Sequence, residues 1–177
     1  MRLAIALGVT FVLCACGQSP PVFSPALIDD ARVTMLRKLM DESGYRASVD
    51  FFCVAVASEV EDWRGKPLRE AQTEPDASRF NTDRDPSDSL LARFVDFRPP
   101  VRKRSDCVRM PREGEWVAGK LRGVLFRLGA VRLLADGTIE IPASTDVHNM
   151  GFSGAIYRLA RRNNCWNIRV PSWIIFS

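Results

Sequence analysis

Three residues of the C-terminal half, Ser144, Asp146 and His148, have the side-chain types of a nucleophile, an acid and a base. They occupy alternate positions of PASTDVHNM, so in a strand all three would face the same way. Same-face neighbours lie about 6.6 Å apart, whereas a hydrolytic triad needs hydrogen-bond contact between its members and an oxyanion hole. The sequence also lacks a Gly-x-Ser-x-Gly elbow. We interpret this segment as a solvated loop and expect no catalytic residues; a periplasmic hydrolase-type enzyme using Asp146 and His148 is the alternative.

Three cysteines lie beyond the N-terminal segment: Cys53, Cys107 and Cys165. None belongs to a Cys-x-x-Cys pair or lies near the single histidine, so no metal site and no cofactor is expected. In an oxidising compartment one disulfide and one odd thiol are expected. Cys107 and Cys165 lie in polar surroundings at the ends of predicted elements and form the preferred pair. Cys53 sits inside an apolar strand and is interpreted as a small buried hydrophobe, so it is left out of the preferred pair. Cys53–Cys107 is the alternative pair.

Two groups of basic residues are candidates for contact with anionic lipid headgroups or an acidic partner. The first is Arg102, Lys103 and Arg104, and the second is Arg158, Arg161 and Arg162. The alternative interpretation is that these basic residues belong to an ordinary solvated surface and bind no partner. Three aromatic residues in or beside a long loop, Trp63, Phe80 and Phe97, either engage a glycan or a protein partner or attach the loop to the core.

The N-terminal segment has the organisation of a secretory signal, with Arg2 followed by an apolar run of 11 residues, Leu3–Leu13. A membrane-spanning helix needs about 20 residues, so this run is too short to cross a bilayer. The next residues, LCAC, resemble the lipobox of bacterial lipoproteins. The resemblance implies cleavage of residues 1–15, lipid on Cys16 with acyl chains such as palmitate, and a tether over 16–24. Gly17 stands where an Asp would indicate retention in the inner membrane, so we expect anchoring in the outer membrane, facing the periplasm.

The remaining residues, 25–177, have the length and composition of one domain with its own core. Hydrophobic residues make up 46% of the chain and charged residues 26%, which are ordinary values for a globular protein. The net charge of +4 is small compared with the dense one-sided charge of nucleic-acid-binding proteins. Export would also separate the protein from nucleic acid, so no nucleic-acid partner is expected.

The N-terminal half of this domain carries signals for two helices and one strand. Ser24 and Pro25 begin an amphipathic pattern that predicts a helix over 25–43. DFFCVAVAS, residues 50–58, predicts a buried strand. Residues 59–84 show no period, and a loop of this length is uncommon. A second, short helix is predicted to be capped by Asp85 and to end before Pro99.

The C-terminal half predicts strands joined by tight turns. The predicted strands cover 121–135, with a bend at Gly129, then 138–143, 153–161 and 165–176, and turns are expected at Asp136-Gly137 and Asn163-Asn164. The resulting fold class is α+β. We expect an antiparallel β-meander of about five strands, curved, covered by one long N-terminal helix and one short helix.

YRLARRNNCWNIRV, residues 157–170, resembles the closing hairpin of small uncharacterised bacterial secreted proteins, and DPSDSLLARFVDFRPPVRKRSDC resembles their middle helix. The resemblance implies a helix-plus-curved-sheet fold and no assigned activity. The sequence therefore predicts an outer-membrane lipoprotein with a non-catalytic domain that binds an envelope protein or a glycan. An accessory domain of a secretion or toxin-related system is a third interpretation.

Overall fold

The structure, a computed structural model of the chain, describes residues 23–65, 77–80, 82–110, 115–147, 151–169 and 173–176. The predicted signal peptide, Cys16 and most of the tether lie outside these residues, as does His148. The α-helices (α) and 3-10 helices (η) are α1 (Pro25–Glu42), η1 (Tyr45–Ala47), η2 (Ala77–Phe80), α3 (Asp88–Leu91), η3 (Ala92–Phe94) and η4 (Arg104–Asp106). The strands are β1 (Phe51–Val56), β2 (Val60–Asp62), β3 (Val101–Lys103), β4 (Val108–Arg109), β5 (Trp116–Ala118), β6 (Leu121–Leu128), β7 (Val131–Leu133), β8 (Ile139–Val147), β9 (Gly151–Arg162), β10 (Cys165–Ile168) and β11 (Trp173–Phe176).

All the described strands belong to one mixed sheet, whose main path is β10-β9-β8-β6-β1-β3. Strand β1 runs parallel to both of its neighbours, β3 and β6, and β2 runs parallel to β7. The other pairs are antiparallel; β11 pairs with β9, and β5 pairs with β4 and β6. The predicted fold class, an antiparallel meander of about five strands under two helices, is therefore wrong: the described chain is mostly β and its sheet is mixed.

Strand β1 explains why the meander prediction fails. All six of its residues are buried, and a continuous apolar run is typical of a strand covered on both faces between parallel neighbours. Its neighbours come from distant parts of the sequence: Phe52 lies beside Val101 on one side and Val124 on the other. A meander instead pairs strands that follow one another along the chain, so it omits both of these contacts.

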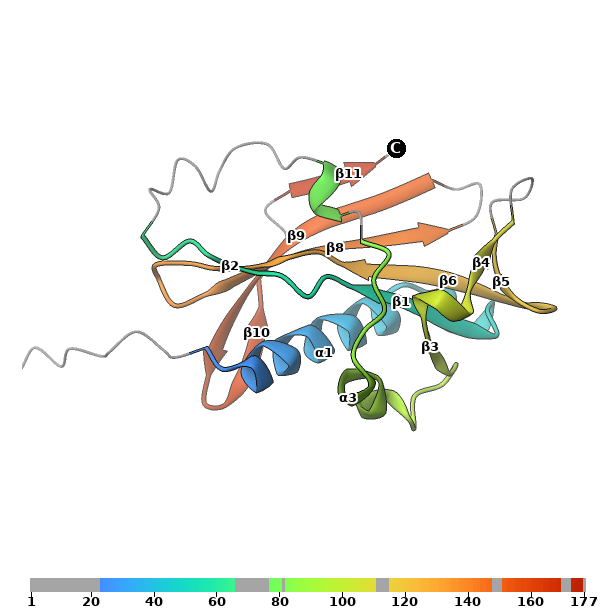
Figure 1. Cartoon of the computed structure of the whole chain (residues 1–177), viewed down its shortest axis with the longest axis horizontal. Helices are drawn as coiled ribbons and strands as arrows, with labels where there is room; N and C mark the ends of the chain where they lie inside the picture. The colour runs from blue at the N-terminus through green and yellow to red at the C-terminus, as the bar shows by residue number, and fades with distance from the viewer. Residues whose placement is uncertain are drawn as a thin grey trace, which may run out of the picture.

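Helix α1 covers one face of the sheet, which we call the α1 face (Figure 1). The helix begins after Ser24, whose Oγ accepts the Leu27 N–H at 3.2 Å, and it ends one residue before the predicted limit. Its buried residues, among them Met35 and Leu36, pack with Phe52 and its same-face neighbours in the larger hydrophobic core. The members of this core in the sheet are Phe52, Val54, Val56, Val124, Phe126, Leu128, Val131, Leu133, Ile139, Ile141, Ala143 and Leu159.

The opposite face of the sheet, which we call the far face, carries a second and smaller core. It contains Phe51, Cys53 and Ala55, the alternate residues of β1. Cys107, Trp116 and Leu125 complete it. Gly123 lies directly against Phe51: a Cβ at this position would be 2.3 Å from Cε2 of the ring, so only glycine fits. Both faces of the central strand are therefore buried, but by different elements.

Two predicted turns are confirmed and two predicted strands are divided. Gly137 has φ +75° between the antiparallel β7 and β8, and Asn163 and Asn164 both have positive φ between β9 and β10. The strand predicted over 121–135 is split at Gly129, where a Cβ would lie 1.9 Å from the carbonyl oxygen of Arg79. The strand predicted over 165–176 becomes β10 and β11, which pair with different parts of β9.

The long segment 59–84 contains β2 and η2, and η2 crosses the far face (Figure 1). The short helix that follows is capped by Ser87, whose Oγ accepts the Leu90 N–H at 3.2 Å. The prediction that Asp85 caps this helix is wrong, because its side chain is used elsewhere. Its carboxylate accepts the Ser105 N–H at 2.7 Å and so attaches the segment before α3 to η4.

Candidate functional site

The far face collects ionisable side chains because strand residues alternate between faces. Glu140, Ser144 and Asp146 share this face of β8. The sheet register places Arg127 of β6 beside Ser144, and Arg158 of β9 beside Glu140. Ser144 and Asp146 therefore share a face of a strand, although a loop is predicted for this segment, and Arg127 lies beside Ser144 and reaches Asp146.

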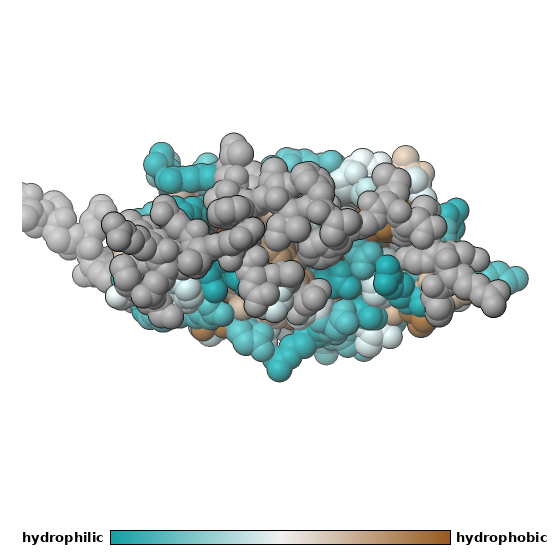
Figure 2. Space-filling view, turned by 90° about the horizontal axis from the view of Figure 1, so that it is seen from above, coloured by the Kyte–Doolittle hydropathy of each residue, from teal (hydrophilic) through white to brown (hydrophobic). Residues whose placement is uncertain are grey.

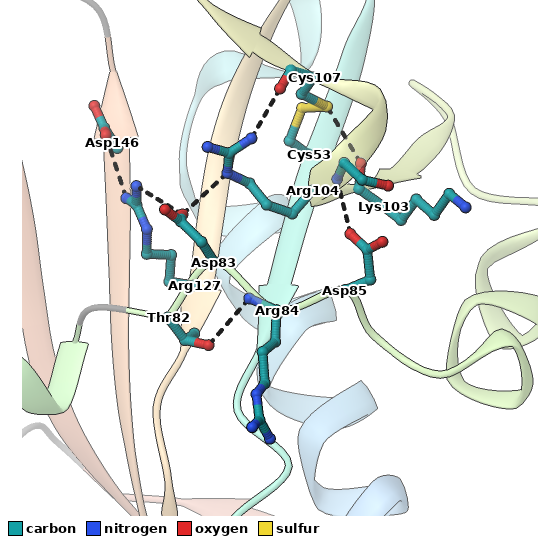
Figure 3. Close-up of polar contacts among 11 residues, drawn as sticks. Cys53, Thr82, Asp83, Arg84, Asp85, Lys103, Arg104, Cys107, Arg127 and Asp146 are labelled. Atoms are coloured by element: carbon teal, nitrogen blue, oxygen red, sulfur yellow. Dashed lines mark hydrogen bonds and ion pairs between the residues drawn. A yellow bond between two sulfur atoms is a disulfide. The ribbon is translucent and has the colours of Figure 1, made fainter.

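Asp83 lies at the centre of a chain of opposite charges, which we call the Asp83 cluster: Asp83, Arg104, Arg127 and Asp146 (Figure 3). The Asp83 carboxylate accepts Arg104 Nε–H at 3.0 Å and lies 3.7 Å from Arg127 Nη2. Arg127 Nη1 in turn donates to Asp146 at 3.2 Å. The cluster joins β6, β8 and η4 through a loop residue.

The Asp83 cluster is continuous with the disulfide and the smaller core. Arg104 Nη1 donates to the carbonyl oxygen of Cys107 at 2.8 Å, and the Arg104 guanidinium lies 4.5 Å from the centre of the Trp116 ring. Cys107 is bonded to Cys53, with 6.5 Å between the two Cα atoms. Arg104 thus binds a carboxylate, a carbonyl and an aromatic ring at once, and its side chain is only 21% exposed.

A second group, the Glu140 cluster (Glu140, Arg79 and Arg158), occupies the far face over β8 and β9. Glu140 is 2% exposed and accepts Arg158 Nε–H at 3.0 Å. Its other oxygen lies 3.9 Å from Arg79 Nη2, and neither of these two buried atoms has a hydrogen bond among the described residues. Burial, together with the charge of Arg132, lowers the pKa of Arg79 to about 10, although Glu140 and Glu61 act in the opposite direction.

Beside this cluster, Glu61 of β2 binds Arg132 of β7. Arg132 Nε donates to Glu61 at 2.7 Å, and its guanidinium lies 3.8 Å from the centre of the Trp63 ring. Trp63 Nε1 donates to the same Glu61 oxygen at 2.9 Å. Burial raises the pKa of Glu61, but the hydrogen bonds and the charge of Arg132 outweigh it, so this pKa lies below its ordinary value. Trp63 is thereby held against the sheet edge.

A pocket of about 420 Å³ opens between the two clusters. Its volume falls within the range of small-molecule sites, but charged groups rather than apolar groups dominate its wall. Two of its lining residues, Glu59 and Arg84, form an ion pair at 2.9 Å. The lining is Ala57, Glu59, Glu61, Ser78, Arg79, Thr82, Asp83, Arg84, Gly129 and Ala130. We call this hollow the far-face pocket.

The far-face carboxylates are held by arginines. The pKa of Glu61 lies below its ordinary value because hydrogen bonds and the charge of Arg132 outweigh burial, so Glu61 is ionised at neutral pH and is a weak base. Asp146 is held by Arg127, and the Ser144 hydroxyl is buried. His148 lies outside the described residues, and those residues contain no cluster suited to hold a metal ion.

The preferred cysteine pair, Cys107–Cys165, is wrong; the structure has the alternative bond, Cys53–Cys107, and Cys165 is a free, exposed thiol. The sequence correctly predicts that Cys53 lies in a buried strand, where it shares a face with Phe51 and Ala55. That face, however, is covered by η4 and β5 rather than by α1, so burial brings Cys107 to Cys53 instead of excluding it.

The two basic groups do not form one surface. Arg102 and Arg104 flank the smaller core, with the Arg102 guanidinium 5.2 Å from the Phe51 ring centre. Arg161 and Arg162 lie at the β9–β10 hairpin, at the other end of the molecule from β3 (Figure 1). Phe80 and Phe97 are buried, so these aromatic residues attach their segments to the core.

The described chain contains no helix long and apolar enough to cross a membrane. Comparisons of the chain with protein-family models, with curated proteins and with solved structures give no match. The site must therefore be interpreted from its own geometry.

Proposed function

We propose that this chain is a lipid-anchored protein of the bacterial outer membrane whose domain faces the periplasm and binds a partner without catalysing a reaction. The observation that carries the binding part is the far-face pocket, a hollow of about 420 Å³ whose carboxylates and guanidinium groups are held in place by ion pairs. Groups fixed in this way recognise a ligand at little cost in side-chain entropy.

The wall of the pocket indicates the kind of ligand. It alternates acceptors, from Glu59, Glu61 and Asp83, with donors, from Arg79 and Arg84. A ligand rich in hydroxyl and amide groups satisfies both kinds at once, which fits a glycan or a polar protein segment. The hydrolase alternative has less support, because Asp146 is bound to Arg127 instead of being available to a base.

The anchor is tested by the intact mass of the protein from the membrane fraction. Wild-type protein is expected to begin at Cys16 and to carry acyl mass, and Cys16→Ser is expected to lose that mass. Cys14→Ser is the matched control, because Cys14 would be removed with the signal peptide, and it should keep the acyl mass. A wild-type protein that begins elsewhere without lipid would contradict the anchor.

The binding role is tested by affinity capture from membranes with the anchor retained. Arg84→Glu changes an exposed residue of the pocket wall and is expected to lose the captured partner. Arg46→Glu is the control, because this residue pairs with Asp41 at the far end of α1, away from the pocket. Equal capture of the partner by the wild type and by Arg84→Glu would contradict the proposal that the far-face pocket binds it.

A further inference from the structure

Four ionisable side chains form a line across the far face, one on each of four neighbouring strands. The register pairs Glu61 of β2 with Arg132 of β7, and their side chains form an ion pair at 2.7 Å. It also places Arg132 beside Glu140 of β8, and Glu140 beside Arg158 of β9, to which it is bound at 3.0 Å. Because the charges alternate and are equal in number, this line, which we call the charge row, is neutral as a whole.

Arg79 of η2 adds a positive charge to the neutral charge row. Within the described chain its one ion pair is with Glu140 at 3.9 Å, and Glu140 already accepts a hydrogen bond from Arg158 at 3.0 Å. Arg79 Nη2 is buried and has no hydrogen bond among those residues. Burial, followed by the charge of Arg132, lowers the pKa of Arg79 to about 10, as expected for a cation that its neighbours balance incompletely.

The other charged residues of the far-face pocket are balanced internally. Glu59 and Arg84 pair with each other, and Glu61 is balanced within the charge row. Asp83 belongs to the Asp83 cluster, which holds two carboxylates and two guanidinium groups. Two nearby carboxylates outside the pocket wall have cations of their own beside them: Asp62 has Arg64, and Asp136 has Arg169 in addition to Arg158. Among the described residues of the pocket wall, Arg79 therefore carries the charge that remains in excess.

The excess charge and the paired groups together indicate the chemistry of the ligand. Charge is screened less inside a protein than in water, so an unbalanced cation at a pocket attracts an anion, and a single carboxylate matches a single excess charge. A hydroxyl group donates to a carboxylate or accepts from a guanidinium, so it can bind Glu59 or Arg84 without separating this ion pair.

The size and surroundings of the far-face pocket fit a sugar. Its volume of about 420 Å³ lies in the lower part of the range for small-molecule sites, which suits a sugar ring better than a length of polypeptide. Figure 2 views the molecule from the side on which η2 lies in Figure 1, and the residues coloured there are mostly hydrophilic.

We propose that the far-face pocket binds a saccharide that bears a carboxylate, with the carboxylate near Arg79 and the hydroxyl groups at Glu59 and Arg84. This inference rests on the proposed function and names the class of ligand for the same pocket. A neutral saccharide would leave the charge of Arg79 unbalanced. An anion without hydroxyl groups would leave the paired groups without the hydrogen bonds that they give up with water.

The test titrates the mature full-length protein by calorimetry with trisaccharides of galacturonic, glucuronic and mannuronic acid. Each acid is compared with its own methyl ester, which keeps the rings and hydroxyl groups but loses the charge. At least one acid is expected to bind about tenfold more tightly than its ester, because a partly buried excess charge is weakly screened. The proposal is overturned if none of the acids binds, if each acid and its ester bind equally, or if triglutamate binds more tightly than every acid.

Substitution of Arg79 separates the effect of its charge from its effect on the fold. Arg79→Gln is expected to lower the preference for acid over ester about tenfold while affinity for the ester stays within about threefold, and Arg79→Lys is expected to keep most of the preference. Arg46→Gln is the control, because it removes one exposed positive charge far from the pocket, and it should leave the preference within about twofold. An equal loss of acid and ester binding in Arg79→Gln would show a structural role only and would overturn the assignment.

Glu140→Gln tests the excess charge in the opposite direction. Glu140 does not line the pocket, and its loss would leave both Arg79 and Arg158 without a balancing carboxylate. The preference for acid over ester is expected to rise by about threefold or more. An unchanged or lower preference in the folded variant would contradict the role given to the excess charge.

Failure of the proposed function is read separately, from the capture experiment with Arg84→Glu. If Arg84→Glu loses the captured partner but no acid is preferred over its ester, the pocket binds a ligand and only the acidic saccharide is wrong. If Arg84→Glu and wild type capture the partner equally and also bind the acids equally, both the proposed function of the pocket and this inference are wrong.

Discussion

On the α1 face, Phe52, Val54 and Val56 pack against an amphipathic helix, whereas on the far face the alternate residues of the same strand meet a disulfide and ion pairs. The first arrangement depends on burial, which is non-directional and follows from a periodic pattern of apolar residues. The second depends on particular partners brought from distant segments, such as Asp83 and Arg127. The two faces should therefore respond differently to substitution.

The largest effect is expected on the α1 face. Phe52 is fully buried and makes an edge contact with Phe126 at 5.3 Å between ring centres. Phe52→Ala is expected to lower the free energy of unfolding by about 3–5 kcal/mol, measured by denaturant titration, because it removes an aromatic ring and leaves a cavity. Val95→Ala, at a position 73% exposed, should change it by less than about 0.5 kcal/mol. Similar losses in the two variants would contradict the assignment of this core.

On the far face, the disulfide is expected to have the next largest effect. Cys53 and Cys107 are 54 positions apart, and a cross-link over this span restricts the unfolded chain by about 4 kcal/mol in the chain-entropy model. Replacing both cysteines by Ala should therefore lower the free energy of unfolding by about 2–4 kcal/mol. Cys165→Ser should be nearly neutral. Non-reducing peptide mapping that finds Cys165 bridged would contradict the pairing.

The Glu140 cluster should contribute less than the disulfide. Glu140→Gln keeps the size of the side chain but removes the charge that neutralises Arg158 and Arg79, at an expected cost of about 1–3 kcal/mol. Glu42→Gln is the control, since Glu42 pairs with Lys38 at an exposed position of α1. If Glu140→Gln and Glu42→Gln lower the free energy of unfolding equally, the buried charge of Glu140 stabilises the fold no more than an exposed ion pair does.

The smallest effect is expected from the Glu61–Arg132 pair, which is partly exposed. The folded pKa of Glu61 lies below its ordinary value of 4.5, so its contribution to stability is present above that pH and is lost as the pH falls through the folded pKa. Arg132→Gln should raise this pKa, measured by NMR titration of the carboxyl group. An unchanged pKa would show that Trp63 and Arg79, rather than Arg132, keep the pKa of Glu61 low.

Local features of the sequence were predictable, and contacts between distant segments were not. The Ser24 cap and the turns at Gly137 and Asn163-Asn164 depend on a few adjacent residues. The parallel pairing of β1 with β6 depends on segments far apart, although the unbroken apolar run of β1 was a signal for burial on both faces.

The candidate site was partly predictable for the same reason. The interpretation of the segment around Ser144 and Asp146 as a solvated loop is wrong, because both residues belong to β8 and Ser144 is buried. Alternation is correct only in the conditional sense that the two side chains share a face once the segment is a strand. Asp83, Arg79 and Glu61 were missed, because they lie in a segment without a period and acquire their role only when it folds over the sheet. The only signal for them was the length of that segment, which is uncommon unless it has a function.

The bond between Cys53 and Cys107 also has a consequence for proteolysis. It closes a covalent ring that contains β2, η2, α3 and β3, with the buried strand β1 at one end of the ring and η4 at the other. A protease that cuts the chain once inside this ring leaves two fragments that remain joined through the sulfur atoms. The N-terminal fragment would then keep the C-terminal strands attached to it, so under the proposed lipid anchor a single nick would not release the sheet from the membrane.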